Sequence, residues 1–222
     1  MQNIEDEQKG DVCLKAAIFD LDGTLWDATA VALPAFRHVL ARLRLPAVSD
    51  QQLALTLGYP LPEIWRMLLP SDKLHLADEA DRLMEETEAE LLNAGQGAPF
   101  PEVADTLALI RQRGFLTFIC SNCQPNYLSF TPDRLGLAHL FDGRYCAGQF
   151  PGLTKVEIVS LIKERHRVTG GFVIGDRFHD VEAGLANGLT AVGCLFGIGT
   201  REELKRADYL ITGFGELKQL VT

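Results

Sequence analysis

The stretch Phe19-Asp20-Leu21-Asp22-Gly23-Thr24-Leu25 follows an apolar run at residues 16–18 and closes a predicted β-strand. Asp20 and Asp22 stand two residues apart at the end of that strand, so both carboxylates can face one crevice if the chain turns, and Gly23 permits the turn. Two neighbouring carboxylates repel each other, so holding them together costs free energy unless a cation lies between them. An Asx turn is the alternative interpretation of the pair. An EF-hand is excluded, because the glycine comes too early and no glutamate stands at the twelfth loop position.

Three other short segments place polar side chains at similar points of the chain. Ser121-Asn122 follows apolar residues 116–120, Thr154-Lys155 lies at a predicted helix start, and Gly175-Asp176-Arg177-Phe178-His179-Asp180 follows residues 172–174. A parallel sheet gathers the carboxyl ends of its strands at one edge, so we expect all four segments to meet there. Together they would supply carboxylates, a lysine and a hydroxyl, the groups needed to hold a divalent cation and to attack a phosphate.

Short apolar runs alternate with helical patterns along most of the chain. The predicted strands lie at residues 16–19, 115–120, 144–146, 172–174, 191–192 and 209–211, and the predicted helices lie near 102–113, 125–135, 155–167, 180–187, 200–206 and 213–221. The apolar runs are continuous instead of alternating, which is typical of strands covered on both faces. The sequence therefore predicts an α/β fold with a doubly wound, Rossmann-like parallel sheet between layers of helices.

Residues 28–98 interrupt this rhythm. The segment has no convincing strand but several helical patterns: apolar residues recur at helical spacing around Phe36, Pro62 can open another helix, and Ser71 is a predicted cap for a long third helix. We expect these residues to form a helical subdomain that is inserted directly after the first strand. The main domain would then consist of the two flanking parts of the chain, residues 1–27 and 99–222.

The composition limits what such a site can act on. The 222 residues are 47% hydrophobic and 23% charged, as in an ordinary globular protein, and their net charge is −9. Nucleic acid and anionic membrane surfaces would be repelled, so neither is an expected partner. No segment reaches the roughly 20 apolar residues of a membrane span, and residues 1–11, a predicted polar tail, are unlike a signal sequence. We expect a cytoplasmic protein, either a monomer or a homodimer.

The cysteines indicate reduced thiols. Their number is odd and they are scattered along the chain, which does not suit a disulfide framework: Cys13, Cys120, Cys123, Cys146 and Cys194. Cys120 and Cys123 form a Cys-x-x-Cys pair, but Cys120 falls within a predicted strand and no second pair exists to complete a metal site. We therefore expect neither redox nor metal chemistry from them.

Ser121-Asn122 and Lys155 each have a structural and a functional interpretation. A hydroxyl and a free N–H at a strand end suit a phosphoryl oxygen, whereas Ser-Asn after a strand can simply form a loop. Thr154 and Glu157 resemble a capping box, which places Lys155 in the first turn of a helix. A cation there opposes the helix dipole and indicates an anionic counterpart, and a surface lysine is the alternative.

Asp176 and Asp180 stand four residues apart around a predicted helix start. This spacing lets both carboxylates face one cation, and hard oxygen ligands suit Mg²⁺. The alternative is a helix in which Asp180 is only the N-cap. We expect no catalytic role for the neighbouring His179.

These segments together resemble the haloacid dehalogenase (HAD) superfamily, in particular its phosphoglycolate phosphatase-like branch with a helical type-1 cap. Residues 20–25 are similar to motif I of that family, Asp-x-Asp-Gly-Thr-Leu. Ser121, Lys155 and residues 175–180 resemble motifs II, III and IV and follow in the family's order. In this resemblance residues 28–98 correspond to the cap.

The resemblance implies a Mg²⁺-dependent phosphatase that hydrolyses a small phosphomonoester metabolite through an aspartyl-phosphate intermediate. Asp20 would be the nucleophile, and Asp22 the general acid and then the base, with its backbone carbonyl on the metal. Lys155 would neutralise the phosphate. The implied phosphate-binding residues are Thr24, Ser121, Asn122 and Lys155, and the implied metal-binding residues are Asp20, Asp22, Asp176 and Asp180.

Two alternative functions remain on the same scaffold. A sugar phosphomutase, similar to β-phosphoglucomutase, would return the phosphoryl group to a sugar hydroxyl instead of water. A non-catalytic regulatory protein could keep the fold, but it would not need the complete set of polar residues: Asp20, Asp22, Ser121, Lys155 and Asp176.

Overall fold

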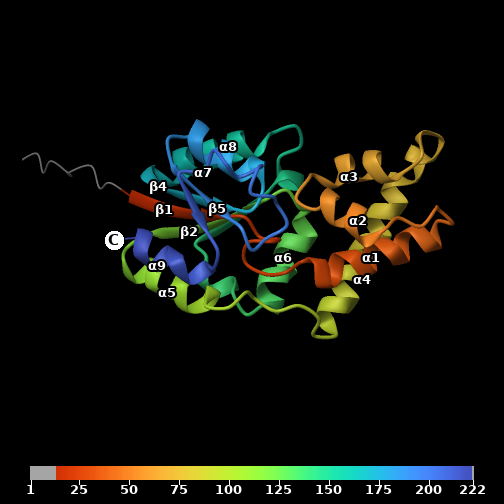
Figure 1. Ribbon diagram of the computed structural model, residues 1–222, viewed down its shortest axis with the longest axis horizontal. Coiled ribbons are helices and arrows are strands. Elements are labelled where there is room, and N and C mark those ends of the chain that lie inside the picture. Colours follow the sequence, from red (N-terminus) through yellow and green to blue (C-terminus); the bar gives the residue numbers. More distant parts are fainter. Residues whose placement is uncertain (1–13, 222) are drawn as a thin grey trace, which may run out of the picture.

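The computed structural model describes residues 14–221, and a single parallel sheet lies at the centre of this part of the chain (Figure 1). The six strands have the order β3-β2-β1-β4-β5-β6. Their bounds are β1 Leu14–Phe19, β2 Leu116–Ser121, β3 Gly143–Cys146, β4 Val168–Gly175, β5 Thr190–Cys194 and β6 Tyr209–Ile211. The predicted doubly wound α/β fold is confirmed. The predicted tail and Cys13 lie outside the described residues.

The strand order reverses at β1, which is the central point of the topology. From β1 the chain builds outward through β2 and β3, then returns to the other side of β1 with β4 and continues to β5 and β6. Phe19, the last residue of β1, is paired with Ile119 of β2 and with Ile174 of β4. In open α/β sheets the crevice outside the carboxyl ends of such strands is the usual binding site.

Helices cover both faces of the sheet. On one face lie α5 (Val103–Gln112), α6 (Pro125–Arg134) and α9 (Leu217–Leu220), and on the other lie α7 (Lys155–His166) and α8 (Phe178–Ala186) (Figure 1). Within β1, Ala17 and Phe19 face the first layer, whereas Ala16 and Ile18 face the second. Both sets of side chains are therefore buried, which explains why the strand is apolar without alternation.

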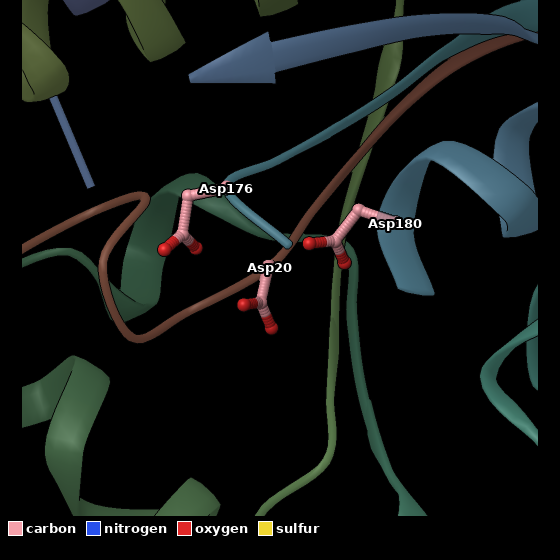
Figure 2. Close-up of side chains that lie close together, drawn as sticks. All are labelled: Asp20, Asp176 and Asp180. Atoms are coloured by element: carbon pink, nitrogen blue, oxygen red, sulfur yellow. The ribbon is translucent and has the colours of Figure 1, made fainter. Parts of the chain in front are cut away.

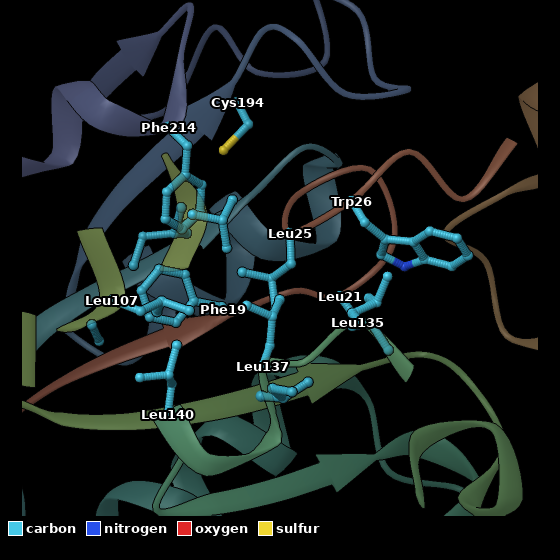
Figure 3. Close-up of a cluster of buried hydrophobic side chains, with 14 of the residues drawn as sticks. Phe19, Leu21, Leu25, Trp26, Leu107, Leu135, Leu137, Leu140, Cys194 and Phe214 are labelled. Atoms are coloured by element: carbon cyan, nitrogen blue, oxygen red, sulfur yellow. The ribbon is translucent and has the colours of Figure 1, made fainter. Parts of the chain in front are cut away.

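The largest of the cores surrounds Phe19 and continues into the loop that carries the Asp-x-Asp stretch (Figure 3). The ring of Phe19 stacks on Phe214, with centroids 5.8 Å apart, and meets the edge of Phe141 at 6.2 Å. Leu21 and Leu25, which flank Asp22, are fully buried in the same core. Leu21 and Leu25 thus hold the loop and its aspartates in place, because moving the two leucines would expose buried hydrocarbon to water.

Four α-helices and a 3₁₀ helix form a separate layer beyond the carboxyl edge of the sheet (Figure 1). They are α1 Thr29–Arg42, α2 Asp50–Thr56, α3 Leu61–Leu68, the 3₁₀ helix η1 Ser71–Leu76 and α4 Ala77–Asn93. They pack around a core of their own, in which the rings of Phe36 and Trp65 meet edge to face at 5.5 Å. Among the described residues, no helix is long and apolar enough to cross a membrane.

The chain passes between the sheet domain and the helical layer at two points that lie side by side. Trp26, on the way out, forms an antiparallel bridge with Pro99, on the way back, and the N–H of Phe100 donates to the carbonyl of Leu25 at 3.0 Å. Gly97 packs against the indole: a Cβ at this glycine would lie 2.4 Å from a ring carbon of Trp26. The two crossings are therefore held together by backbone pairing and close packing.

Some predicted elements differ from the structure. Residues 201–206 form turns instead of a helix. The N–H of Leu204 donates to the carbonyl of Thr200, four residues back, at 3.2 Å, whereas the N–H of Ala207 donates to the carbonyl of Leu204, only three residues back. Ser71 begins the 3₁₀ helix and does not cap α4, which continues directly from that helix at Ala77. The helix predicted at 213–221 is a short 3₁₀ turn followed by α9.

Candidate active site

Three aspartates from two distant parts of the chain meet at the carboxyl edge of the sheet (Figure 2). Asp20 directly follows β1, Asp176 directly follows the neighbouring strand β4, and Asp180 lies in the first turn of α8. All three are buried, and one oxygen of each lies within 4.8 Å of the others. The expectation that strand ends would bring these side chains together is therefore met.

Lys155 lies among these carboxylates. Its Nζ donates to Oδ1 of Asp20 at 2.8 Å and to Oδ1 of Asp180 at 2.6 Å. Thr154 and Glu157 form the predicted capping box, which holds the lysine in the first turn of α7. Burial works to lower the pKa of Lys155, but the charges of Asp180 and Asp20 outweigh it and raise that pKa, so the amine stays charged.

Asp176 is fixed by the loops around it. Its Oδ1 accepts a hydrogen bond from the hydroxyl of Thr24 at 3.1 Å, and its Oδ2 accepts one from the N–H of Ile198 at 2.7 Å. Gly23, with φ of +79°, and Gly197 leave room for this carboxylate, because a Cβ at either would lie within 2.5 Å of an Asp176 atom. Burial, followed by the charges of Asp20 and Asp180, raises the pKa of Asp176 to about 8.

The donor set of this cluster fits a magnesium ion. It consists of hard carboxylate oxygens from Asp20, Asp176 and Asp180, without sulfur or imidazole. Burial raises the pKa of Asp20 to about 6, and the nearby charge of Asp180 adds to the effect while Lys155 opposes it. Three buried carboxylates against one lysine leave an excess of negative charge, which a divalent cation would offset.

The carboxyl group of Asp22 is not one of the three that form this cluster. Its Oδ1 accepts two hydrogen bonds, one from the indole N–H of Trp26 and one from the hydroxyl of Tyr127, both at 2.9 Å. Burial, and next the charge of Asp20, raises the pKa of Asp22 to about 7. A carboxyl with such a pKa can give and take a proton near neutral pH. The sequence analysis did not find Tyr127, which lies on α6 with no motif around it.

The remaining predicted site residues lie at the same edge. Ser121 ends β2, is buried, and its Oγ accepts a hydrogen bond from the N–H of Cys123 at 3.3 Å. Asn122 is also buried, and its side-chain amide donates to the carbonyl of Gly58 at 2.8 Å. Gly58 belongs to the loop between α2 and α3, so Asn122 connects the sheet domain to the helical layer. The hydroxyl of Thr24 is committed to Asp176.

Arg177 forms a second connection to the helical layer, and the sequence analysis did not identify it. Its guanidinium lies 4.9 Å from the ring centre of Tyr59, its Nε donates to Glu203 at 3.0 Å, and it also donates to the carbonyl of Leu57. His179 meets the ring of Tyr59 at 5.3 Å. Burial, reinforced by the charges of Lys155 and Arg177, lowers the pKa of His179 to about 4.

The described cysteines form no disulfide. Cys120 is buried within β2, and burial raises the pKa of its thiol to about 12. The thiol is therefore protonated at neutral pH and unsuited to redox chemistry or metal binding.

A cavity of about 380 Å³ opens beside Asp20 and Asp22, between the edge of the sheet and the helical layer. Tyr59 and residues of α1, α3 and α4 line it from the helical side, and Ser121, Asn122 and Tyr127 line it from the sheet side. The site thus combines buried carboxylates, a charged lysine and an adjoining space large enough for a small metabolite.

The chain is a member of the haloacid dehalogenase-like hydrolase family, whose model matches residues 17–194. Among curated proteins it is 29% identical over 216 residues to a phosphoglycolate phosphatase of Synechococcus elongatus, a match that covers 94% of this chain and 98% of that one. It is 24% identical over 196 residues to the probable phosphatase IndB of Dickeya dadantii, with 86% and 85% covered. The predicted family and a phosphatase-type enzyme are confirmed.

Solved structures agree on the fold. A predicted phosphoglycolate phosphatase from Haemophilus somnus superposes with a TM-score of 0.83 at 18% identity, over 96% of this chain and all of that one. A haloacid dehalogenase-like hydrolase from Streptococcus pneumoniae gives a TM-score of 0.79 at 21% identity, over 94% and 99% of the two chains. At these identities the likeness concerns the fold alone.

Proposed function

We propose that this chain is a Mg²⁺-dependent phosphomonoesterase that acts on a small phosphorylated metabolite through an aspartyl-phosphate intermediate. The observation that carries the proposal is the position of Lys155, whose amine is within hydrogen-bond distance of Asp20 and Asp180 beside Asp176. A cation and a cluster of buried carboxylates at one point are the arrangement that a phosphate dianion and a divalent metal ion together require.

In the first step, an oxygen of Asp20 attacks the phosphorus atom, and the bond between phosphorus and the ester oxygen breaks. Asp22 donates its proton to the departing oxygen, which leaves as an alcohol. Lys155 offsets the negative charge of the phosphoryl oxygens, and Ser121 and Asn122 lie beside them at the end of β2.

In the second step, Asp22 removes a proton from a water molecule, which attacks the phosphorus of the aspartyl phosphate. The bond to Asp20 breaks, inorganic phosphate leaves, and both carboxyl groups return to their starting states. The hydrogen bonds from Trp26 and Tyr127 to Oδ1 of Asp22 leave Oδ2 to exchange the proton.

Asp20, Asp176 and Asp180, with the backbone carbonyl of Asp22, are the groups that we propose to hold Mg²⁺. When bound, the ion would neutralise phosphate charge and keep the nucleophile ionised. Residues 28–98 would act as a cap that closes over the substrate and excludes water, while residues 1–27 and 99–222 form the core. The cytoplasmic location and the monomeric or homodimeric state stay predictions from the sequence.

The test is phosphate release from a panel of phosphorylated metabolites and from p-nitrophenyl phosphate, with Mg²⁺ and with a chelator. We expect Mg²⁺-dependent turnover by the parent protein and a loss of at least roughly a hundredfold in Asp20→Asn, the scale of effect seen when a nucleophile is removed. Asp105→Asn, a change at an exposed aspartate of α5, is the matched control. Equal rates for the parent and Asp20→Asn would refute the role of Asp20.

A further inference from the structure

The cavity beside Asp22 is the space that the leaving group must occupy. If Asp22 protonates the ester oxygen, the group attached to that oxygen lies on the side of the site where Asp22 is accessible. Asp22 lines the cavity of about 380 Å³. It does not line the other cavity near the site, which reaches Lys155 from the side of α3. The walls of the first cavity therefore define the chemistry of the leaving group.

Those walls carry negative charge from the helical layer. Asp81, Glu85 and Glu88 of α4 all line the cavity. Asp81 accepts a hydrogen bond from the indole N–H of Trp65, and Glu85 accepts one from the amide of Asn126 at 2.7 Å. Within the part of the chain that the structure describes, the carboxyl group of Glu88 has neither a hydrogen bond nor an ion pair.

No cation of the cavity is free to balance these groups. Arg82 is the only lysine or arginine among the described residues that line it. Its guanidinium is paired with Glu86 at 2.7 Å, and its side chain is 58% exposed. A carboxylate on the leaving group would find three acidic side chains and no unpaired partner of opposite charge.

Much of the remaining wall is apolar or aromatic, and polar side chains line it at the sheet side: Ser121, Asn122, Gln124 and Asn126. Phe36, Ile64 and Met84 contribute hydrocarbon, and Tyr59 and Tyr127 contribute rings. A short alkyl chain fits such a wall, and a cationic group at its end would meet the carboxyl group of Glu88, which is half-buried at the cavity. Burial, followed by the charges of Asp22 and Glu85, raises the pKa of Glu88 well above its ordinary value, which a bound cation would reverse.

We propose that the substrate is a phosphomonoester whose leaving group bears an amino group, held as an ammonium by Glu88 while its carbon chain lies against the apolar wall. This proposal rests on the phosphatase activity proposed above and specifies the substrate class. It also excludes phosphoglycolate as the preferred substrate, because the leaving group of that ester ends in a carboxylate.

The first test compares three esters of nearly equal size that differ in their terminal group: 2-aminoethyl phosphate, 2-hydroxyethyl phosphate and 2-phosphoglycolate. The amino and hydroxyl members are also compared with three- and four-carbon chains. We expect kcat/KM to be at least about tenfold higher for the amine than for the alcohol of the best chain length, and lowest for the carboxylate. Equal or better hydrolysis of the alcohol at every length, or of phosphoglycolate, overturns the proposal.

The second test removes the charge of Glu88. Glu88→Gln should lower kcat/KM for the amine at least about tenfold more than for the alcohol and so remove the preference, because the amide retains the shape but cannot form an ion pair. Glu90→Gln, two residues along the same helix and exposed outside the cavity, is the matched control and should leave all rates unchanged. An unchanged amine preference in Glu88→Gln contradicts the assignment.

A binding measurement separates this inference from the proposed activity. Calorimetric melting is followed with Mg²⁺ and inorganic phosphate plus ethanolamine, 3-aminopropanol or 4-aminobutanol, and with the matching diols and glycolate. At least one amino alcohol should raise the Tm more than its diol and glycolate do, and Glu88→Gln should abolish the difference. This measurement can be made even if no ester is hydrolysed. Equal Tm values for all additives would contradict the proposed amine site but not the proposed phosphatase activity.

Discussion

The hydroxyl of Tyr127 donates a hydrogen bond to Oδ1 of Asp22 at 2.9 Å, although the two residues are 105 positions apart in the sequence. The indole N–H of Trp26 donates to the same oxygen at 2.9 Å. One carboxyl oxygen is thus fixed from two directions, and the other is left for chemistry. This arrangement makes Tyr127 and Trp26 positioning residues for the proton transfer proposed for Asp22.

Tyr127→Phe removes one of the two donors without changing the ring. We expect kcat to fall about tenfold with a smaller change in KM, since a hydrogen bond to a charged group is worth about 1.5–3 kcal/mol and tenfold in rate is about 1.4 kcal/mol. Tyr145→Phe is the matched control, because its hydroxyl contacts His166 at 2.7 Å, away from Asp22. Equal kcat for both variants would argue against positioning by Tyr127.

Lys155→Met should destabilise the protein as well as inactivate it. The variant leaves Asp20 and Asp180 buried without their partner, and breaking a buried ion pair in this way costs about 3–5 kcal/mol. Urea unfolding measures the loss. Lys205→Met removes an exposed pair with Glu202 and should cost less than about 1 kcal/mol. Similar losses for the two variants would mean that Lys155 is not held as described.

Mg²⁺ should stabilise the folded protein against heat. A ligand that binds only the native state at a hundred times its Kd adds about 2.7 kcal/mol, which corresponds to a rise in Tm of several degrees. The rise should be much smaller in Asp176→Asn and unchanged in Asp105→Asn, whose exposed carboxylate lies on α5. A Tm that does not respond to Mg²⁺ in the parent protein would contradict the metal site.

Glu88→Gln should raise the stability of the protein at alkaline pH. Burial and the neighbouring acids raise the pKa of Glu88 in the folded state above the ordinary 4.5, so the folded protein holds this proton more tightly than the unfolded chain does. That stabilisation is complete below pH 4.5 and is lost as the pH rises through the folded pKa, because ionised Glu88 is disfavoured only in the folded state.

Glu88→Gln does not lose stability in this way as the pH rises, because glutamine does not ionise. At pH 8, without added amine, its Tm should exceed that of the parent, because glutamine carries no charge that the folded state disfavours. At pH 4 the two Tm values should be nearly equal. Scanning calorimetry at both pH values makes the comparison, with Glu90→Gln as the control. A variant that is less stable than the parent at pH 8 would show that the carboxylate has a favourable partner.

The meeting of Asp20, Asp176 and Asp180 could be predicted because strand ends obey a simple rule. An unbroken apolar run marks a strand buried on both faces, and parallel strands bring their carboxyl ends to one edge. Lys155 could be predicted in the same way from the capping box at the start of α7. In each case the side chain follows a local pattern that fixes its position relative to the sheet.

Tyr127, Arg177 and Glu88 could not be predicted with these rules, because their contacts depend on how helices pack. Tyr127 reaches Asp22 only because α6 packs near the loop after β1. Arg177 contacts the ring of Tyr59 only because the loop between α2 and α3 lies next to the site. Glu88 looks like any solvated acid of a Glu-rich helix until α4 is placed over the cavity. The predicted helix at 200–206 is wrong, because those residues form turns.

The bridge between Trp26 and Pro99 means that the seventy or so residues of the helical layer begin and end at almost the same place. Partners in an antiparallel bridge have Cα atoms only about 5 Å apart, a gap that a tight turn can close. A chain without that layer could therefore keep its six strands in register. Evolution can lengthen, shorten or exchange such a layer, and so change which metabolite is accepted, without rebuilding the chemistry beneath it.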